Sequence, residues 1–149
     1  MVSSMAELHS AIDALPLSHQ HWDTIEWLMV VRSAEQKELA AHGIRGGHGE
    51  AYSRFLSRGE GKSQLEAIAL NRLPPGSSWG PKKHADAEEF FFVVSGEAEV
   101  LDDGERHMLV MGDLIHARPG DMLAIRNSHP EHDLVFLAGL LKHPTGFFR

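Results

Sequence analysis

The sequence contains no cysteine, and this absence excludes disulfide bonds, thiolate metal sites and cysteine nucleophiles together. It also has no apolar run of the length that spans a membrane. Its first residues, MVSSMAELHSAIDALPLS, lack the basic start and apolar stretch of a secretion signal. We therefore expect a cytoplasmic protein without a membrane partner.

Positive charge is scarce as well. Lysine and arginine number 14 against 21 aspartates and glutamates, giving a formal net charge of −7, and the basic residues are scattered along the chain. Proteins that bind nucleic acid usually carry a clustered basic surface. Nucleic acid is therefore not an expected partner.

Histidine, in contrast, is abundant, with 11 residues in a chain of 149. Histidine is a common metal ligand and the side chain that titrates nearest neutral pH, so this number raises the question of a metal or acid–base site. The length and a hydrophobic content of 42% suit one folded domain with its own core.

The amino-terminal part differs in pattern from the rest. Residues 4–14 and 34–41 have helical composition, residues 25–31 resemble a strand, and GIRGGHG at 43–49 is too rich in glycine to be anything but a loop. We predict that residues 1–45 form a short extension, of helices and one strand, that packs on a domain formed by residues 46–149.

After this extension, short apolar segments alternate with turn sequences such as DDGE and RPGD. Short strands with such regular turns are typical of an antiparallel sandwich or barrel, not of alternating strands and helices. The predicted fold class is therefore all-β. The predicted strands are residues 52–56, 65–73, 90–94, 98–101, 108–110, 114–117, 122–125 and 134–141.

Two spaced motifs lie within these strands. The first motif runs from Gly76 through five residues to Lys82-x-His84, then through four residues to Glu89 and through six to Gly96. The second motif runs from Gly112 through five residues to Arg118-x-Gly120, then through two residues to Leu123 and through three to Asn127. Order and spacing resemble the paired motifs of the cupin superfamily over roughly residues 65–141. The resemblance implies a double-stranded β-helix, or jelly-roll, barrel whose lumen holds the site.

Cupins usually hold a divalent metal with three histidines and one glutamate. Here Lys82 stands at the first histidine position and Leu123 at the last, so only His84 and Glu89 remain. Zinc, iron and manganese normally take three or four protein ligands. The resemblance therefore implies a degenerate metal site.

Alternation along a strand puts Lys82 and His84 on one face. Glu89, Phe91 and Val93 share another, as do Leu123, Ile125 and Asn127, and the cupin arrangement implies that all three faces converge on the lumen. We assign Lys82, His84 and Glu89 as candidate catalytic residues. The candidate substrate-binding residues are Trp79, Phe91, His116, Leu123 and Asn127.

Three interpretations of this site remain open. In the first, no metal is bound, Lys82 is the counter-charge of Glu89, and the three side chains perform acid–base chemistry on a small organic molecule. In the second, His116, or after it His107, completes a site for Zn, Fe, Mn or Ni with His84 and Glu89. In the third, the pocket has no chemistry.

The function predicted from these residues is a small-molecule-binding cupin, an enzyme of the isomerase, cyclase or decarboxylase type. The alternatives are a metal-dependent cupin enzyme with a substitute histidine ligand, or a non-catalytic cupin that binds a metabolite and regulates a partner. Phe90, Phe92 and Val94 would lie outside the barrel and need cover, so we also expect a homodimer.

Overall fold

The computed structural model describes residues 31–57 and 64–142. These belong to one compact unit that begins at Val31, and residues 1–30 lie outside the described residues. The helix expected at residues 4–14 and nearly all of the strand expected at 25–31 fall in that undescribed part. The boundary predicted between residues 45 and 46 falls inside a loop of the compact unit, and it stays a prediction.

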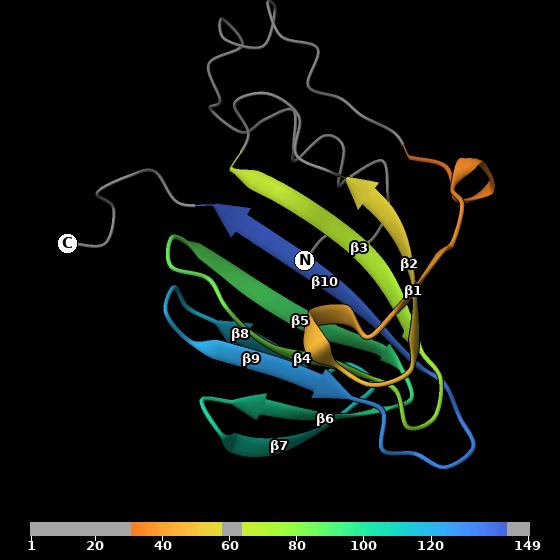
Figure 1. Cartoon of the computed structure of the whole chain (residues 1–149). Coiled ribbons are helices and arrows are strands. Elements are labelled where there is room, and N and C mark those ends of the chain that lie inside the picture. Colours follow the sequence, from red (N-terminus) through yellow and green to blue (C-terminus); the bar gives the residue numbers. More distant parts are fainter. Residues whose placement is uncertain (1–30, 58–63, 143–149) are drawn as a thin grey trace, which may run out of the picture. The chain divides into compact units, whose positions relative to one another are not determined.

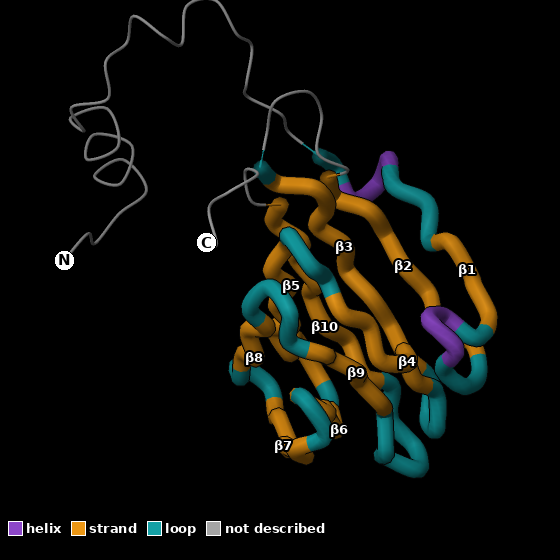
Figure 2. Tube along the Cα trace, turned by 60° about the vertical axis from the view of Figure 1, so that its left-hand side comes forward, coloured by secondary structure: helices purple, strands orange, loops and turns teal. Residues whose placement is uncertain are grey.

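The described strands form two antiparallel sheets, one of six strands in the order β1-β2-β3-β10-β5-β8 and one of four in the order β4-β9-β6-β7. Figure 2 shows the β4-β9-β6-β7 sheet lying across the longer sheet. The predicted all-β jelly-roll class is confirmed. The strands are β1 (Leu39–His42), β2 (Glu50–Ser57), β3 (Leu65–Leu73), β4 (Ser78–Lys83), β5 (Ala87–Ser95), β6 (Glu97–Asp102), β7 (Glu105–Val110), β8 (Leu114–Ala117), β9 (Met122–Arg126) and β10 (Leu134–Lys142).

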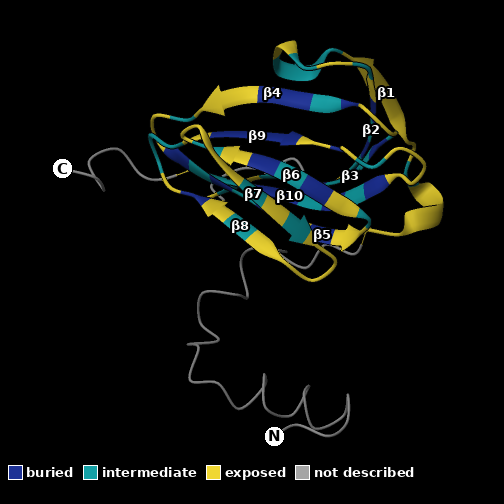
Figure 3. Ribbon diagram, turned by 90° about the horizontal axis from the view of Figure 1, so that it is seen from below, coloured by how far each residue is buried: buried dark blue, intermediate teal, exposed yellow. Residues whose placement is uncertain are grey.

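The core fills the space between the sheets because side chains alternate along each strand. Buried segments occur on strands of both sheets (Figure 3). At the centre, the rings of Trp79, Phe91 and Phe136 meet edge to face, with centroid separations of 6.0, 5.1 and 5.2 Å. Such T-shaped contacts stabilise a core beyond simple burial.

The outer face of β5 is apolar, as the sequence indicated. Phe92 and Val94 are 36% and 41% exposed, and Leu114 on neighbouring β8 is 55% exposed. Phe90 packs over Gly139 of β10, where a Cβ atom would overlap its ring. The homodimer that this face suggested stays a prediction.

The helix predicted for residues 34–41 is wrong. A 3₁₀ turn, η2, occupies Ser33–Glu35, and the strand β1 follows at Leu39–His42. β1 pairs with β2 in antiparallel register, for example Ala40 with Tyr52. Isolated helices of this length are marginal, so pairing with a sheet edge overrides local helical propensity.

The spacing of the two motifs is explained by their glycines. Gly76, Gly96, Gly112 and Gly120 all adopt positive φ, a conformation that other residues rarely take. At Gly96 a Cβ atom would also crowd Leu134 and the carbonyl of Asp133. Within the described residues, no helix is long and apolar enough to cross a membrane.

Candidate functional site

The carboxylate of Glu89 is a buried charged group inside the barrel. Alternation along β5 turns Glu89 inward beside Phe91, and its side chain is only 4% exposed. Arg45 donates to both of its oxygens, from Nη1 to Oε1 at 2.9 Å and from Nη2 to Oε2 at 2.7 Å. A bidentate, charge-assisted pair of this kind is among the strongest polar contacts in proteins.

Arg45 reaches Glu89 from the glycine-rich loop at residues 43–49. Its own backbone is left-handed, with φ 54° and ψ 33°, within the 3₁₀ turn η3 (Ile44–Gly46). The loop backbone lies directly on β4, because a Cβ atom at Gly80 would overlap the Arg45 carbonyl and one at Gly47 would overlap that of Ser78. The loop is thus fixed by backbone contacts that only glycine permits.

The guanidinium of Arg45 also lies over an aromatic ring, with its central carbon 5.1 Å from the centroid of the Trp79 ring. This is within the range of a cation–π contact. The Trp79 Nε1 atom is buried and has no hydrogen-bond partner among the described residues. A buried N–H group without an acceptor is rare in folded proteins.

His84 stands next to the ion pair. Its Nε2 atom lies 3.7 Å from Glu89 Oε2, is buried, and has no hydrogen-bond partner among the described residues. Burial lowers the pKa of His84 below its ordinary value, and the charges of Arg45 and Lys82 lower it further, against the opposing effect of Glu89 and Glu66. The imidazole is therefore neutral near neutral pH.

This lowered pKa predicts how stability depends on pH. As the pH falls, the unfolded chain binds a proton at His84 before the folded chain does, so stability is lost below about pH 6.5, the ordinary pKa of histidine. Urea unfolding of the wild type and His84→Gln between about pH 8 and pH 5 measures this contribution. The wild type is expected to lose more stability on acidification, and parallel curves would contradict the assignment.

A pocket of about 240 Å³ opens beside the ion pair. Arg45 and Glu89 are its charged residues, and the Ser53 hydroxyl donates to Asn71 Oδ1 at 2.7 Å in its wall. The rest of the lining is largely apolar, which is typical of a small-molecule site with few polar groups. The remaining lining residues are Ile44, Phe55, Ala67, Ala69, Trp79, Ala138, Gly139 and Leu140.

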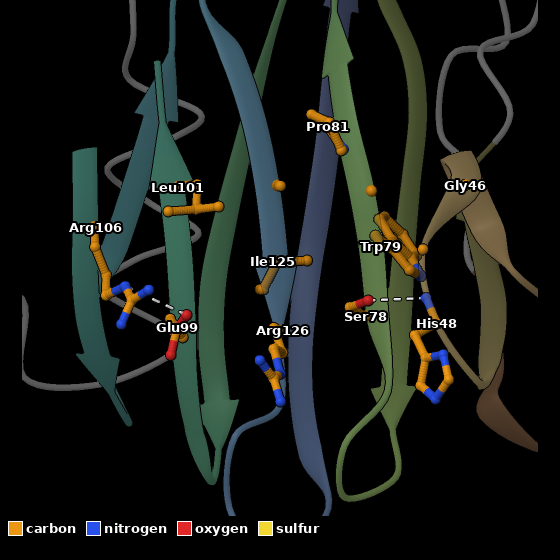
Figure 4. Close-up of a pocket in the computed structure, with 13 residues that line it drawn as sticks. Gly46, His48, Ser78, Trp79, Pro81, Glu99, Leu101, Arg106, Ile125 and Arg126 are labelled. Atoms are coloured by element: carbon orange, nitrogen blue, oxygen red, sulfur yellow. Dashed lines mark hydrogen bonds and ion pairs between the residues drawn. The ribbon is translucent and has the colours of Figure 1, made fainter. Parts of the chain in front are cut away.

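A second hollow of about 460 Å³ lies over β4, β9 and β6 (Figure 4). Its charged residues are Glu99, Arg106 and Arg126, and Arg106 Nε lies 3.5 Å from Glu99 Oε1 with the arginine 68% exposed. Trp79 borders both hollows. Of the candidate catalytic residues, Glu89 lines the first hollow and none lines the second, so we place the site at the first.

Lys82 is exposed on β4 and lies opposite Leu123 of β9. No acidic group of the described residues lies within ion-pair distance of Lys82, and the counter-charge of Glu89 is Arg45 instead. Lys82 still acts on His84 through its charge. Its catalytic role stays a prediction.

Three of the candidate substrate-binding residues are fully buried. Phe91 and Leu123 belong to the apolar core cluster. The Asn127 amide donates to the carbonyls of Leu73 and His132, both at 2.8 Å, and accepts from the backbone of His129 at 3.0 Å. Asn127 therefore holds the chain after β9 in place, and contact of these residues with a substrate remains untested.

The histidines considered as extra metal ligands do not meet His84 and Glu89. His116 is 46% exposed, pairs across strands with Phe90, and lies 3.3 Å from Glu88 on the outer face of the sheet. His107, on β7, is 41% exposed, and its Nε2 atom lies 4.0 Å from Glu105 Oε2. The structure thus leaves the metal interpretation without a third ligand from either residue.

The donor set does not fit the metal that the resemblance implies. Among the described residues, no group of three or more histidine, cysteine, aspartate or glutamate side chains could hold a metal ion. Both oxygens of Glu89 already accept from Arg45, whose positive charge would repel a metal cation at the same place. A divalent metal is therefore unconfirmed, and no chemical step below depends on one.

Arg45, the partner of Glu89, was not predicted from the sequence. Its only signal was its position inside GIRGGHG, which indicated a loop but no role. The motif comparison ended with the barrel strands and did not extend to this loop. The motif already contained a cation, Lys82, as the expected counter-charge of Glu89, so the sequence contained no signal for a second one.

Comparison with known proteins agrees with this architecture. The family profile described as "Cupin domain" matches residues 69–139. The chain is 33% identical over 114 residues to the oxalate-binding protein of Thermotoga maritima, covering 76% of this chain and 93% of that protein. It is 29% identical over 90 residues to quercetin 2,3-dioxygenase of Bacillus subtilis, which covers 56% of this chain but only 27% of that enzyme.

The fold is shared with a solved structure. The crystal structure of a predicted oxalate decarboxylase from Thermotoga maritima superposes with a TM-score of 0.71 at 33% sequence identity, covering 76% of this chain and 99% of that one. The structure has two antiparallel sheets and the spaced glycine motifs, and the chain matches a relative over nearly that relative's whole length. The chain belongs to the cupin superfamily.

Proposed function

We propose that the pocket beside Glu89 binds a small organic acid and that Glu89 and His84 exchange a proton with it. The observation that carries this proposal is the partly buried Arg45, which lines the pocket and whose guanidinium contacts a carboxylate and an aromatic ring. A planar guanidinium recognises carboxylates through two parallel hydrogen bonds. We therefore propose a carboxylate as the class of ligand.

Two further features support a carboxylate ligand. Trp79 lines the pocket, and its buried Nε1 lacks an acceptor among the described residues, so a ligand oxygen that reached it would gain a hydrogen bond. The oxalate-binding relative is matched over 93% of its length, and oxalate is the smallest dicarboxylate. We therefore take oxalate as the first probe.

The proton chemistry rests on the arrangement of Glu89 and His84. A neutral imidazole lies 3.7 Å from a buried carboxylate, and such neighbours form a general acid–base pair. Lys82, whose charge acts on His84, would add positive potential at the rim. This proposal retains the isomerase, cyclase or decarboxylase class without choosing among them.

Binding is tested by calorimetric titration with oxalate, malonate and the uncharged analogue oxamide. Oxalate and malonate are expected to bind and oxamide to bind at least tenfold more weakly, since a lost charged contact costs more than about 1.4 kcal/mol. Arg45→Met is expected to abolish binding, whereas Arg118→Met, at an arginine 81% exposed, should leave it unchanged. The absence of binding by either dicarboxylate would refute the proposal.

The acid–base role is tested separately from binding. In D₂O, Glu89 would remove a proton from the central carbon of bound malonate and deuterium from solvent would replace it, so proton NMR should show the signal decay in proportion to protein concentration. Glu89→Gln keeps the shape of the side chain but cannot act as a base, and exchange should fall to the rate of buffer alone. Binding without exchange in the wild type would favour the non-catalytic, metabolite-binding alternative.

A further inference from the structure

Glu89 occupies the carboxylate-binding side of Arg45 in the described structure. Both Nη atoms donate to Glu89, at 2.9 and 2.7 Å, and this is the geometry that a ligand carboxylate would adopt. These bonds use one hydrogen of each Nη atom, so an external carboxylate can take this same end-on contact only by replacing Glu89. Glu89 would therefore compete with a ligand carboxylate for Arg45.

We infer that Glu89 is an internal competitor that sets the affinity and the ligand class of this pocket, and that a bound carboxylate exchanges places with it on Arg45. This inference rests on the proposed function. The ligand gains two hydrogen bonds from Arg45, and Glu89 turns to a second partner. A planar carboxylate, with two acceptor oxygens spaced as those of Glu89 are, matches the contact that it replaces.

The structure provides a partner for each carboxylate after the exchange. His84 Nε2 lies 3.7 Å from Glu89 Oε2 and has no hydrogen bond among the described residues, so it is placed to donate to Glu89 once Arg45 leaves. The Trp79 side chain lines the pocket, and its Nε1 is also buried and unpartnered among the described residues, so it is a second donor that a bound ligand could engage. Buried donors without acceptors are rare in folded proteins, and the exchange gives both donors an acceptor.

The exchange requires side-chain movement only. The loop that carries Arg45 is held against β4 where a Cβ at Gly80 would overlap the Arg45 carbonyl, so its backbone stays in place. The guanidinium, 17% exposed, borders the pocket directly. A short rotation of the arginine and glutamate side chains therefore suffices.

The test compares oxalate affinity in the wild type and in Glu89→Gln. When a resting contact occupies the binding group, the apparent affinity falls by the fraction of molecules in which that group is free. Weakening the resting contact should thus raise oxalate affinity, by about tenfold for Glu89→Gln and less for Glu89→Asp, which keeps the charge but shortens the reach. The matched control is Glu88→Gln, the next residue along β5, whose side chain faces His116 on the outer surface and should leave affinity unchanged.

The outcomes separate the two proposals. If the wild type binds oxalate and both Glu89 variants bind it equally or more weakly, Glu89 is not a competitor and this inference fails, while the proposed function stands. If neither the wild type nor Glu89→Gln binds oxalate or malonate, both fail. Glu89→Asp decides the matter should Glu89→Gln not fold.

Discussion

Replacing Phe91 with alanine is expected to lower the free energy of unfolding by about 4 kcal/mol. The ring is fully buried and meets Trp79 and Phe136 edge to face. Alanine would leave a cavity that the two flanking sheets cannot close, because both are fixed by strand pairing. Urea or guanidinium unfolding measures the loss directly.

Phe91→Leu is the matched control for this prediction. Leucine retains most of the apolar volume, so this variant should lose only about 1–1.5 kcal/mol of the free energy of unfolding, much less than the alanine variant. Phe91 does not line the pocket beside Glu89, so oxalate affinity of the folded leucine variant should be unchanged. An alanine variant as stable as the wild type would mean that this ring does not pack in the core.

Replacing Arg45 with methionine is expected to lower the free energy of unfolding by about 3 kcal/mol, the lower end of the cost of removing one partner of a buried ion pair. The lower end applies because Arg45 is 17% exposed, although Glu89 is only 4% exposed. Methionine keeps the apolar stem over Trp79 and removes the charge, so Glu89 is left buried without its cation. The measurement is best made near pH 8, where a neutral His84 cannot replace that cation.

Arg118→Met controls for the loss of an arginine as such. Arg118 is 81% exposed and its Nε lies 3.6 Å from Asp121, and exposed pairs of this kind contribute less than about 1 kcal/mol. Its replacement should change stability little. Equal effects at Arg45 and Arg118 would contradict a special role for the buried pair.

The fold was predictable because the motifs encode backbone geometry. Glycine at a position of positive φ, such as Gly96 or Gly120, is required by the turn itself, so spacing between such residues survives changes of chemistry. Strand alternation put Glu89 and Phe91 on one face, and the cupin resemblance implied that this face points inward. These features depend on local sequence, and the structure bears them out.

The partner of Glu89 was not predictable in the same way. Lys82 was the nearest cation in the motif, yet strand β4 leaves it exposed, and the cation comes from Arg45, which is 44 residues away in sequence. That approach depends on the backbone contact between the 43–49 loop and Gly80. Long-range packing also explains why residues 39–42 pair with β2 as a strand although residues 34–41 have helical composition.

The central claim is that Arg45 and Glu89 act as one unit, and a double-mutant cycle tests it most directly. The cycle compares the free energies of unfolding of the wild type, Arg45→Met, Glu89→Leu and the double variant at about pH 8. We predict that the double variant is more stable than the sum of the single losses implies, by at least about 2 kcal/mol, because removing both charges leaves neither one buried alone. Losses that add to within about 0.5 kcal/mol would show that the two side chains are energetically independent and would contradict the account.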